Sequence, residues 1–388
     1  MDKRVYFLMI VSFIIGMVEL IISGLLDLIA GDLHVSIGAA GFLVTIFSLI
    51  FAIASPILLL MTAKIERKKL TLIFLFFFLI GNVVSIISPN YSILLLGRII
   101  TALSGALLII LCLVMAPTIV EPKYRGRAIG IVSMGVSGSL VLGVPVGLML
   151  GEMFSWRAPF IFIAILTALS LIGVFFFMDR VEPKPSVPLR LQLATLKSRK
   201  ILFAHFSTFL YMSGHSVLYT YLKPFVQETM DLSATWISIL FLIFGIAAVS
   251  GGGLGGTFAD TLGTKRTIIS SILIFSTVIL VIPYTTFFMP IFLIALVLWG
   301  IMSWAISPAM QSYLIDSSPE TSDIQQSLSN SSLHFGIAFG SFVGGMIIGK
   351  LPIEANAIIG GLFILASLGT MLISLKSSLV SNKASSTM

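Results

Sequence analysis

Charged residues are scarce in this chain of 388 residues, where Asp, Glu, Lys and Arg together make up 10% of the total. A typical soluble domain has roughly a quarter of its residues charged. Hydrophobic residues make up 57%, and the mean hydropathy is +1.11. So few charges cannot surround a core of this size with a solvated surface, and the composition predicts an integral membrane protein.

Cysteine is nearly absent, since Cys112 is the only one and it lies inside an apolar run. Disulfides and thiolate metal clusters within the chain are therefore excluded. The loops hold no His, Cys or Asp group with the spacing of a metal site or a nucleophile. We expect no catalytic residues, no metal and no cofactor, which argues against a membrane enzyme. A channel is a further alternative, but no filter-like segment or acidic ring supports it.

Long apolar runs dominate the chain, and about 20 such residues suffice for a helix to cross a bilayer. Twelve runs follow one another: 5–26, 39–61, 70–88, 92–115, 127–149, 158–178, 201–222, 236–258, 266–284, 289–314, 326–349 and 356–376. The first is too long for a cleaved signal peptide. The sequence predicts an all-α integral membrane protein with twelve transmembrane helices.

Basic residues gather on one side of the predicted membrane. If the N-terminus is cytoplasmic, the inner segments hold 19 of the 23 Lys and Arg residues: Lys3, Arg4, Lys64, Arg67, Lys68, Lys69, Lys123, Arg125, Arg127, Arg180, Lys184, Arg190, Lys197, Arg199, Lys200, Lys265, Arg266, Lys376 and Lys383. The positive-inside rule then predicts that both termini are cytoplasmic. Topology thus accounts for the net charge of +7, and nucleic acid is not an expected partner.

A polar segment, 179–200, divides the runs into two sets of six. Shifting the second set back by 196 residues puts Ile201 on Val5 and His215 on Glu19, which indicates an internal repeat of the kind that many secondary transporters have. We predict an N-terminal six-helix half (1–178), a cytoplasmic linker (179–200), a C-terminal six-helix half (201–376) and a disordered tail (377–388).

One carboxylate, Glu19, lies deep in an apolar run, about 11 Å from the outer end at 1.5 Å per residue. An ionisable group in hydrocarbon costs about 2.5–3.5 kcal/mol on insertion scales and calls for a functional reason. Arg98 lies at a similar height in its own run, and a buried arginine pairs with an acid or with backbone carbonyls. We expect Glu19 and Arg98 to couple transport to protons, with a purely structural pair as the alternative.

Two motifs carry a resemblance to a known family. After the eighth run, Gly256, Asp260, Gly263, Lys265 and Arg266 follow the spacing of the signature loop of the major facilitator superfamily, which they resemble. Asp260 is placed to accept from amides at the start of the next helix. The first-half segment 62–69 departs from this pattern.

The fifth run contains Gly143, Pro145 and Gly147 and resembles the helix-five motif of the drug:proton antiporters in that superfamily, although Val144 interrupts the usual Gly-Pro pair. Glycines permit close helix contact and Pro145 opens the backbone ladder. Simple packing is the alternative reading of this run. The resemblance implies that both motifs serve conformational change.

Other segments are similar to the bacterial purine base and nucleoside efflux pumps of the drug:proton antiporter-1 family: 17–20, 62–69, 124–130, 155–157, 204–205, 214–219, 303–304 and 308–314. The resemblance implies a proton-coupled efflux transporter of the bacterial plasma membrane that exports small planar solutes by alternating access. A multidrug (chloramphenicol-like) or sugar exporter is the alternative within the family. The partners that we expect for this protein are a small-molecule substrate, protons and the lipid bilayer, and we expect it to be a monomer.

Polar side chains inside the apolar runs mark a candidate substrate site. Several recur at spacings of three and four in the seventh run and so share one helix face. Aromatic, hydroxyl and imidazole groups can stack on a planar heterocycle and bind its edges, although each can also serve only in packing. The candidates are Thr208, Tyr211, His215, Tyr219, Gln311, Asn330 and His334.

Overall fold

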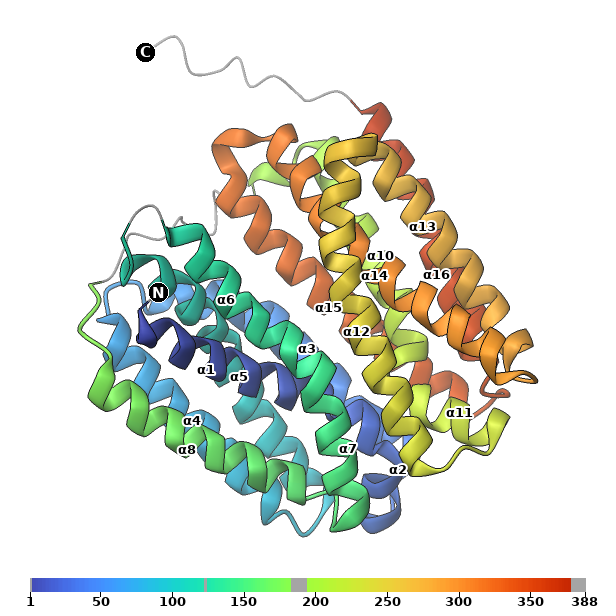
Figure 1. The fold of residues 1–388 in the computed structure, drawn as a ribbon, viewed down its shortest axis with the longest axis horizontal. Coiled ribbons are helices and arrows are strands. Elements are labelled where there is room, and N and C mark those ends of the chain that lie inside the picture. The colour runs from blue at the N-terminus through green and yellow to red at the C-terminus, as the bar shows by residue number, and fades with distance from the viewer. Residues whose placement is uncertain (1, 122–123, 183–193, 378–388) are drawn as a thin grey trace.

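The computed structural model describes residues 2–121, 124–182 and 194–377. Its regular elements in these ranges are helices (Figure 1), which confirms the all-α prediction, and helices fall on each of the twelve predicted runs. The linker predicted at 179–200 lies partly, and the tail predicted at 377–388 almost wholly, outside the described residues.

The helices form two groups, which we call the N-group and the C-group. The N-group consists of α1 (Lys3–Leu20), α2 (Ile22–Asp32), α3 (Ile37–Met61), α4 (Arg67–Ile86), α5 (Tyr91–Met115), α6 (Arg125–Gly138), the π-helical turn η3 (Ser139–Gly143), α7 (Val144–Met153) and α8 (Ala158–Phe177). The C-group consists of α10 (Arg199–Tyr219), α11 (Leu222–Met230), α12 (Ala234–Phe258), the π-helical turn η4 (Ala259–Gly263), α13 (Thr264–Val281), α14 (Met289–Ser317), α15 (Ser322–Ile348) and α16 (Ala355–Lys376).

Nine helical stretches in the described part of the chain are long and apolar enough to cross a membrane, and the bent pair α1–α2 adds a tenth. One of the nine joins α12 to α13 through η4, and α10, with its many polar residues, is not among them. The protein therefore crosses the membrane many times, while the count of twelve stays a prediction. We call the end with the start of α1 and the end of α16 the inner end, after the predicted orientation, and the opposite end the outer end.

Two predicted helices are broken. The run 5–26 forms α1 and α2, which are bent by 49° at Ile21, where the amide of Gly24 donates to the Ile21 carbonyl in a tight three-residue turn. The run 201–222 ends in a break between α10 and α11. Pro224 explains it, because proline has no N–H for the Thr220 carbonyl and its ring clashes with that group. Both breaks follow shortly after the residues Glu19 and His215 that the 196-residue shift aligns.

Each group has its own apolar core. One cluster of buried residues lies within 5–178 and joins α1, α3, α4, α5, α6 and α8. A second lies mainly within 204–371 and also takes in Leu140, Val144 and Leu148 of η3 and α7. The groups are therefore packed units that meet along a shared surface, in which η3 and α7 contact α12.

Glycines let α6, η3 and α7 approach α1 and α2 closely. A Cβ on Gly135 would lie 2.2 Å from the Met9 carbonyl oxygen, and one on Gly147 would lie 2.0 Å from the Ile21 side chain. The π turn η3 ends at Gly143, two residues before Pro145, so the backbone ladder is irregular next to the proline. These glycines permit close helix packing, and a role of the motif in conformational change stays a prediction.

The signature loop differs from expectation in one respect. The chain stays helical through η4, so Asp260 belongs to the end of the preceding helix rather than to the start of α13. The N-cap of α13 is Gly263, with a φ of 90°, and no side chain caps it. The expectation that Asp260 caps the next helix is therefore wrong. The positive φ explains the glycine, since other residues are strained in that region.

We predict that Gly135→Ala destabilises the protein, because its methyl group would collide with the backbone of α1. The matched control is Gly130→Ala on the same helix, where a Cβ would have no neighbour within 4 Å. The control should leave stability unchanged or raise it by up to about 1 kcal/mol through helix propensity. Thermal unfolding in detergent measures both, and equal midpoints for the two variants would contradict the close packing of α6 on α1.

Candidate functional site

The deep carboxylate faces an imidazole of the other group. Glu19 Oε1, near the end of α1, lies 3.4 Å from His334 Nδ1, near the middle of α15. The His334 ring packs on Phe51 of α3, with ring centroids 4.3 Å apart. Both polar side chains are largely buried, and His334 Nδ1 has no partner of hydrogen-bond geometry among the described residues. A titratable pair therefore bridges the two groups at mid-depth.

Arg98 lies directly beside this pair. Its Nη1 donates to the Val18 carbonyl at 2.8 Å, and its guanidinium lies 4.3 Å from the Phe47 ring centroid. We expect a deep arginine to pair with an acid or with backbone carbonyls, and the hydrogen bond of Arg98 is to a backbone carbonyl. That carbonyl is in the last turn of α1, where the helix break leaves acceptors without intrahelical partners. Nε and Nη2 of the fully buried Arg98 lack partners in the described chain.

His215 lies in an aromatic cluster inside the C-group. Trp299 Nε1 donates to His215 Nδ1 at 3.1 Å, and the rings of Tyr219, Phe244 and Phe275 surround the imidazole at centroid distances of 5.0 to 6.1 Å. Because an indole N–H can only donate, Nδ1 accepts and the proton is on Nε2. The structure brings His334, not His215, to Glu19.

The other predicted substrate residues have other surroundings. Thr208 donates to the Ala204 carbonyl within α10, while Tyr211 is buried in the C-group core. The Tyr219 hydroxyl is buried without a hydrogen-bond partner in the described chain. Asn330 is half-buried on α15.

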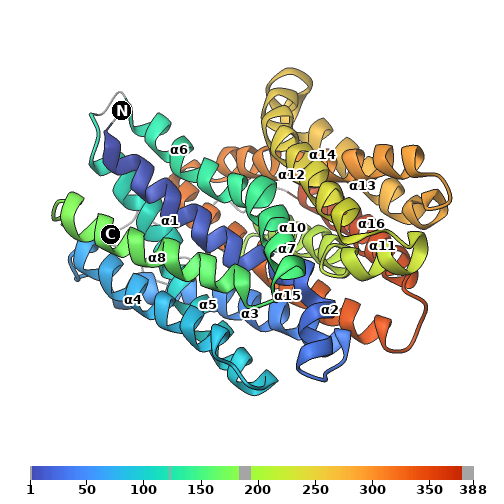
Figure 2. The same ribbon diagram turned by 60° about the horizontal axis from the view of Figure 1, so that its bottom comes forward.

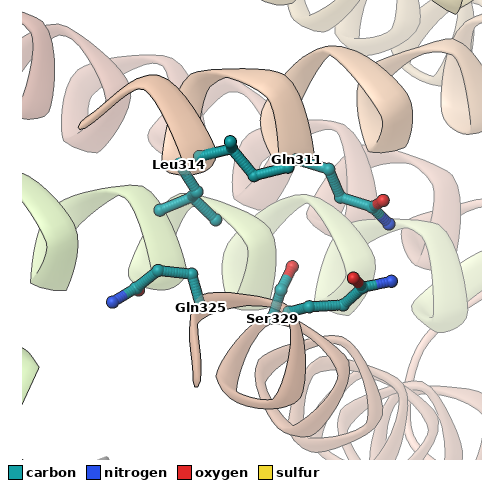
Figure 3. Close-up of a pocket in the computed structure, with 6 residues that line it drawn as sticks. Gln311, Leu314, Gln325 and Ser329 are labelled. Atoms are coloured by element: carbon teal, nitrogen blue, oxygen red, sulfur yellow. The ribbon is translucent and has the colours of Figure 1, made fainter. Parts of the chain in front are cut away.

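Gln311 lines a small pocket toward the inner end of the C-group (Figure 3). Gln325, Gln326 and Ser329 of α15 face it across the pocket, which has room for about one water molecule, about 10 Å³. His205 Nε2 lies 2.9 Å from Gln325 Oε1 and holds that amide in place. Among the predicted site residues, Glu19 and His334 form one pair, His215 and Tyr219 belong to the aromatic cluster, and Gln311 lines this amide pocket.

A buried cation closes the outer end. Lys223 of α11, with no exposed surface, lies 2.7 Å from Asp27 Oδ1 of α2 and 2.6 Å from Glu152 Oε1 of α7. Gln227 also donates to Asp27 at 3.3 Å. The helices α2, α7 and α11 lie near one another at this end in both views (Figure 1 and Figure 2). Three charges thus join the N-group to the C-group.

Sequence reasoning missed this cluster, because Asp27 falls one residue beyond the predicted first run and Lys223 one residue beyond the seventh. One feature of the sequence could have revealed the cluster: the predicted outer segments hold only three Lys or Arg residues, and Lys223 is one of them. Another of the three, Arg157, pairs with Asp32 at 2.7 Å within the N-group.

Apolar contacts complete the closure next to the charges. Tyr221 donates to the Ser341 carbonyl at 2.9 Å, and its ring fills the space beside Gly41 of α3 and Gly345 of α15. A Cβ on Gly38 would lie 2.6 Å from the Gly345 carbonyl oxygen, so α3 and α15 nearly touch there. Toward the inner end, Ser331 donates to the Ala52 carbonyl. The contacts between the groups therefore gather at the outer end and at mid-depth.

A model of the Major Facilitator Superfamily matches residues 8–341 and 204–387. The chain belongs to this superfamily. It is 34% identical over 365 residues to the uncharacterized MFS-type transporter YbcL of Bacillus subtilis (strain 168), with 94% of each chain covered. It is 28% identical over 360 residues to the inner membrane transport protein YdhP of Escherichia coli (strain K12), with 91% and 92% covered.

Solved structures agree on the fold. A bacterial homolog of the human lysosomal transporter Spinster, in an inward-facing and occupied conformation, superposes with a TM-score of 0.79 at 16% identity and covers 97% of both chains. Together with the apolar helices, these relationships make the protein a multi-pass secondary transporter of the cell membrane.

We predict that Lys223→Met destabilises the closed outer end, because it leaves two carboxylates facing each other without a cation. Removing one member of a buried pair costs about 3–5 kcal/mol, an upper bound here because Asp27 and Glu152 are 26% and 28% exposed. Asp27→Asn should cost less, since Lys223 keeps Glu152. Thermal unfolding in detergent measures the losses, with Lys350→Met as the control for an exposed outer cation. A loss no larger than that of the control would remove Lys223 from the closure.

Proposed function

We propose that this protein exports small planar solutes, with purine bases or nucleosides as the leading class, in exchange for protons and by alternating access. The observation that carries the proposal is the Glu19–His334 pair, which joins the two groups at mid-depth beneath a closed outer end. A carboxylate in this position can take up a proton from one side of the membrane and release it to the other as the groups rock.

The pair also suggests how the proton and the conformation are coupled. Ionised Glu19 has two neighbouring groups that can balance its charge, namely Arg98 beside the Val18 carbonyl and a protonated His334 across the interface. A proton on Glu19 removes that attraction and weakens the joint between α1 and α15. Substrate binding and protonation of Glu19 would then favour different arrangements of the two groups, so that one excludes the other. Such mutual exclusion is what exchange of substrate for protons requires.

A planar substrate suits the aromatic cluster and the amides. In the described chain, neither the His215 Nε2–H nor the Tyr219 hydroxyl has a hydrogen-bond partner. The rings of Trp299 and Phe244 lie next to these two polar groups. Stacking combined with edge hydrogen bonds would select a heterocycle. The resemblance to purine efflux pumps of the drug:proton antiporter-1 family supports purines over the alternatives, a multidrug or sugar exporter with the same coupling.

Everted membrane vesicles test the function directly. Uptake of radiolabelled hypoxanthine, adenine and guanosine should rise with an imposed pH gradient, acidic inside, and collapse when an uncoupler removes it. Counterflow in proteoliposomes distinguishes a carrier from a channel or an enzyme. Transport of chloramphenicol or a sugar without any purine transport would show that the substrate is a drug or a sugar and not a purine. Absence of gradient dependence would reject proton exchange.

We predict that Glu19→Gln abolishes gradient-driven export and leaves substrate counterflow at least partly intact, because the amide keeps the shape and hydrogen bonding but cannot titrate. The control is Glu228→Gln, which removes an exposed carboxylate on α11. Vesicle transport with and without the pH gradient separates the two activities. Full gradient-driven transport by the Glu19 variant would exclude it from coupling.

We predict that His215→Ala changes the ranking or the apparent affinity of the exported purines. Losing a hydrogen bond that leaves its partner unpaired costs about 1–3 kcal/mol. Phe206→Ala serves as the control, since Phe206 lies on the same helix, α10, but its side chain is exposed on the surface of the protein. Competition among hypoxanthine, adenine and guanosine measures the ranking. If both variants keep the wild-type ranking and affinity, His215 serves only to position Trp299.

A further inference from the structure

A second, larger pocket opens at the inner end of the C-group, away from the Glu19–His334 pair. It has a cavity volume of about 400 Å³. Lys200 from the start of α10, Lys265 and Arg266 from the start of α13, and Tyr313 and Asp316 from the end of α14 line it. Elements far apart in the sequence thus build one cavity, which includes part of the signature loop but none of the residues proposed to bind substrate or protons.

The lining carries three cations and a single carboxylate, Asp316. Lys265 and Asp316 both act electrostatically on Lys200, so the one carboxylate compensates part of the charge, and the Lys200 Nζ lies 5.2 Å from the Tyr313 ring centroid. Like charges held this near repel one another, and an anion between them relieves the repulsion. The excess of positive charge therefore favours an anionic ligand.

Neighbouring contacts hold the lining in place. Ser374 of α16 donates to the Lys200 carbonyl at 2.6 Å, and its Oγ lies 3.0 Å from the Tyr313 hydroxyl. Beside them Ser317, whose side chain is 3% exposed, lies against the Tyr313 side chain. These contacts hold Lys200 and Tyr313 in place at the wall of the pocket.

Backbone donors add to the same cavity. The pocket includes Gly263 and Thr264, where α13 begins. No side chain caps this helix, so the N–H groups of its first turn keep their hydrogen-bonding capacity. The N-terminal end of an eighteen-residue helix, which carries a partial positive charge, therefore lies at the wall of this cavity.

We propose that this pocket binds a phosphate group, presented either by an anionic lipid headgroup of the inner leaflet or by a soluble phosphate compound. A phosphate has several acceptor oxygens, which match the Arg266 guanidinium, the two ammonium groups and the free amides of α13. A carboxylate would satisfy fewer of these donors. The site is independent of the substrate and proton steps, so it stands or falls separately from the proposed function.

Binding of inorganic phosphate to the purified full-length protein tests the soluble source. Isothermal titration in neutral detergent compares wild type with the double variant Lys265→Gln/Arg266→Gln. The matched control is Arg125→Gln/Arg127→Gln, which removes two exposed cations from the start of α6 at the same end of the molecule. We expect the pocket variant to bind about tenfold or more weakly, as for the loss of a charge-assisted contact, and the control to stay within about twofold of wild type.

Native mass spectrometry with phosphatidylglycerol tests the lipid source. The pocket variant should retain fewer phosphatidylglycerol molecules than wild type, and added inorganic phosphate should displace that lipid if both use one site. Weakening of either ligand by the pocket variant alone supports the proposal and identifies the source. No binding of either ligand, or equal weakening in the pocket and control variants, overturns it. Because the substituted residues are exposed, unchanged thermal unfolding verifies that each variant is folded.

Discussion

The ion cluster of Lys223 with Asp27 and Glu152 determines how the two groups of helices meet. A fully buried ammonium needs compensating charge, and both of its carboxylates come from the opposite group. Lys223 therefore requires α2, α7 and α11 to converge at the outer end. The close approach of α3 to α15 at Gly38 and the packing of Tyr221 follow from the same convergence. With that end closed, the Glu19–His334 pair is placed beneath it at mid-depth.

Sequence periodicity and composition suffice for the helical architecture, because hydrocarbon permits few alternatives to a continuous apolar helix. The helices fall on the predicted runs, and the superfamily resemblance is confirmed. What the runs could not reveal is where a helix bends. The break before Leu222 had a visible cause in Pro224, but the break at Ile21 has no proline or side-chain cap to announce it.

The site was foreseen residue by residue but not in its arrangement. Depth in an apolar run identified Glu19, Arg98 and His334, because a polar group there is costly enough to stand out. Which imidazole meets Glu19 depends on how the groups dock, and an internal repeat describes only equivalent positions within each group. The repeat therefore makes His215 the equivalent of Glu19 in the other group, whereas the residue that contacts Glu19 across the interface is His334. Lys223 and Asp27 were missed because, at the edge of a run, a charged residue has nothing unusual about it.

The π turn η3 holds one more residue per turn than the α-helix around it, so it stores a possible register shift inside a continuous helix. If η3 rewound as α-helix, α7 would rotate by about 100° and advance by about 1.5 Å relative to α6. Glu152 lies on α7, beyond this turn, and would be carried away from Lys223. The Leu140 carbonyl of η3 packs against Gly245 of α12. A movement of α12 in the C-group would therefore act directly on this turn. A local change of winding would thus release one of the two carboxylates from the outer cluster without breaking any helix.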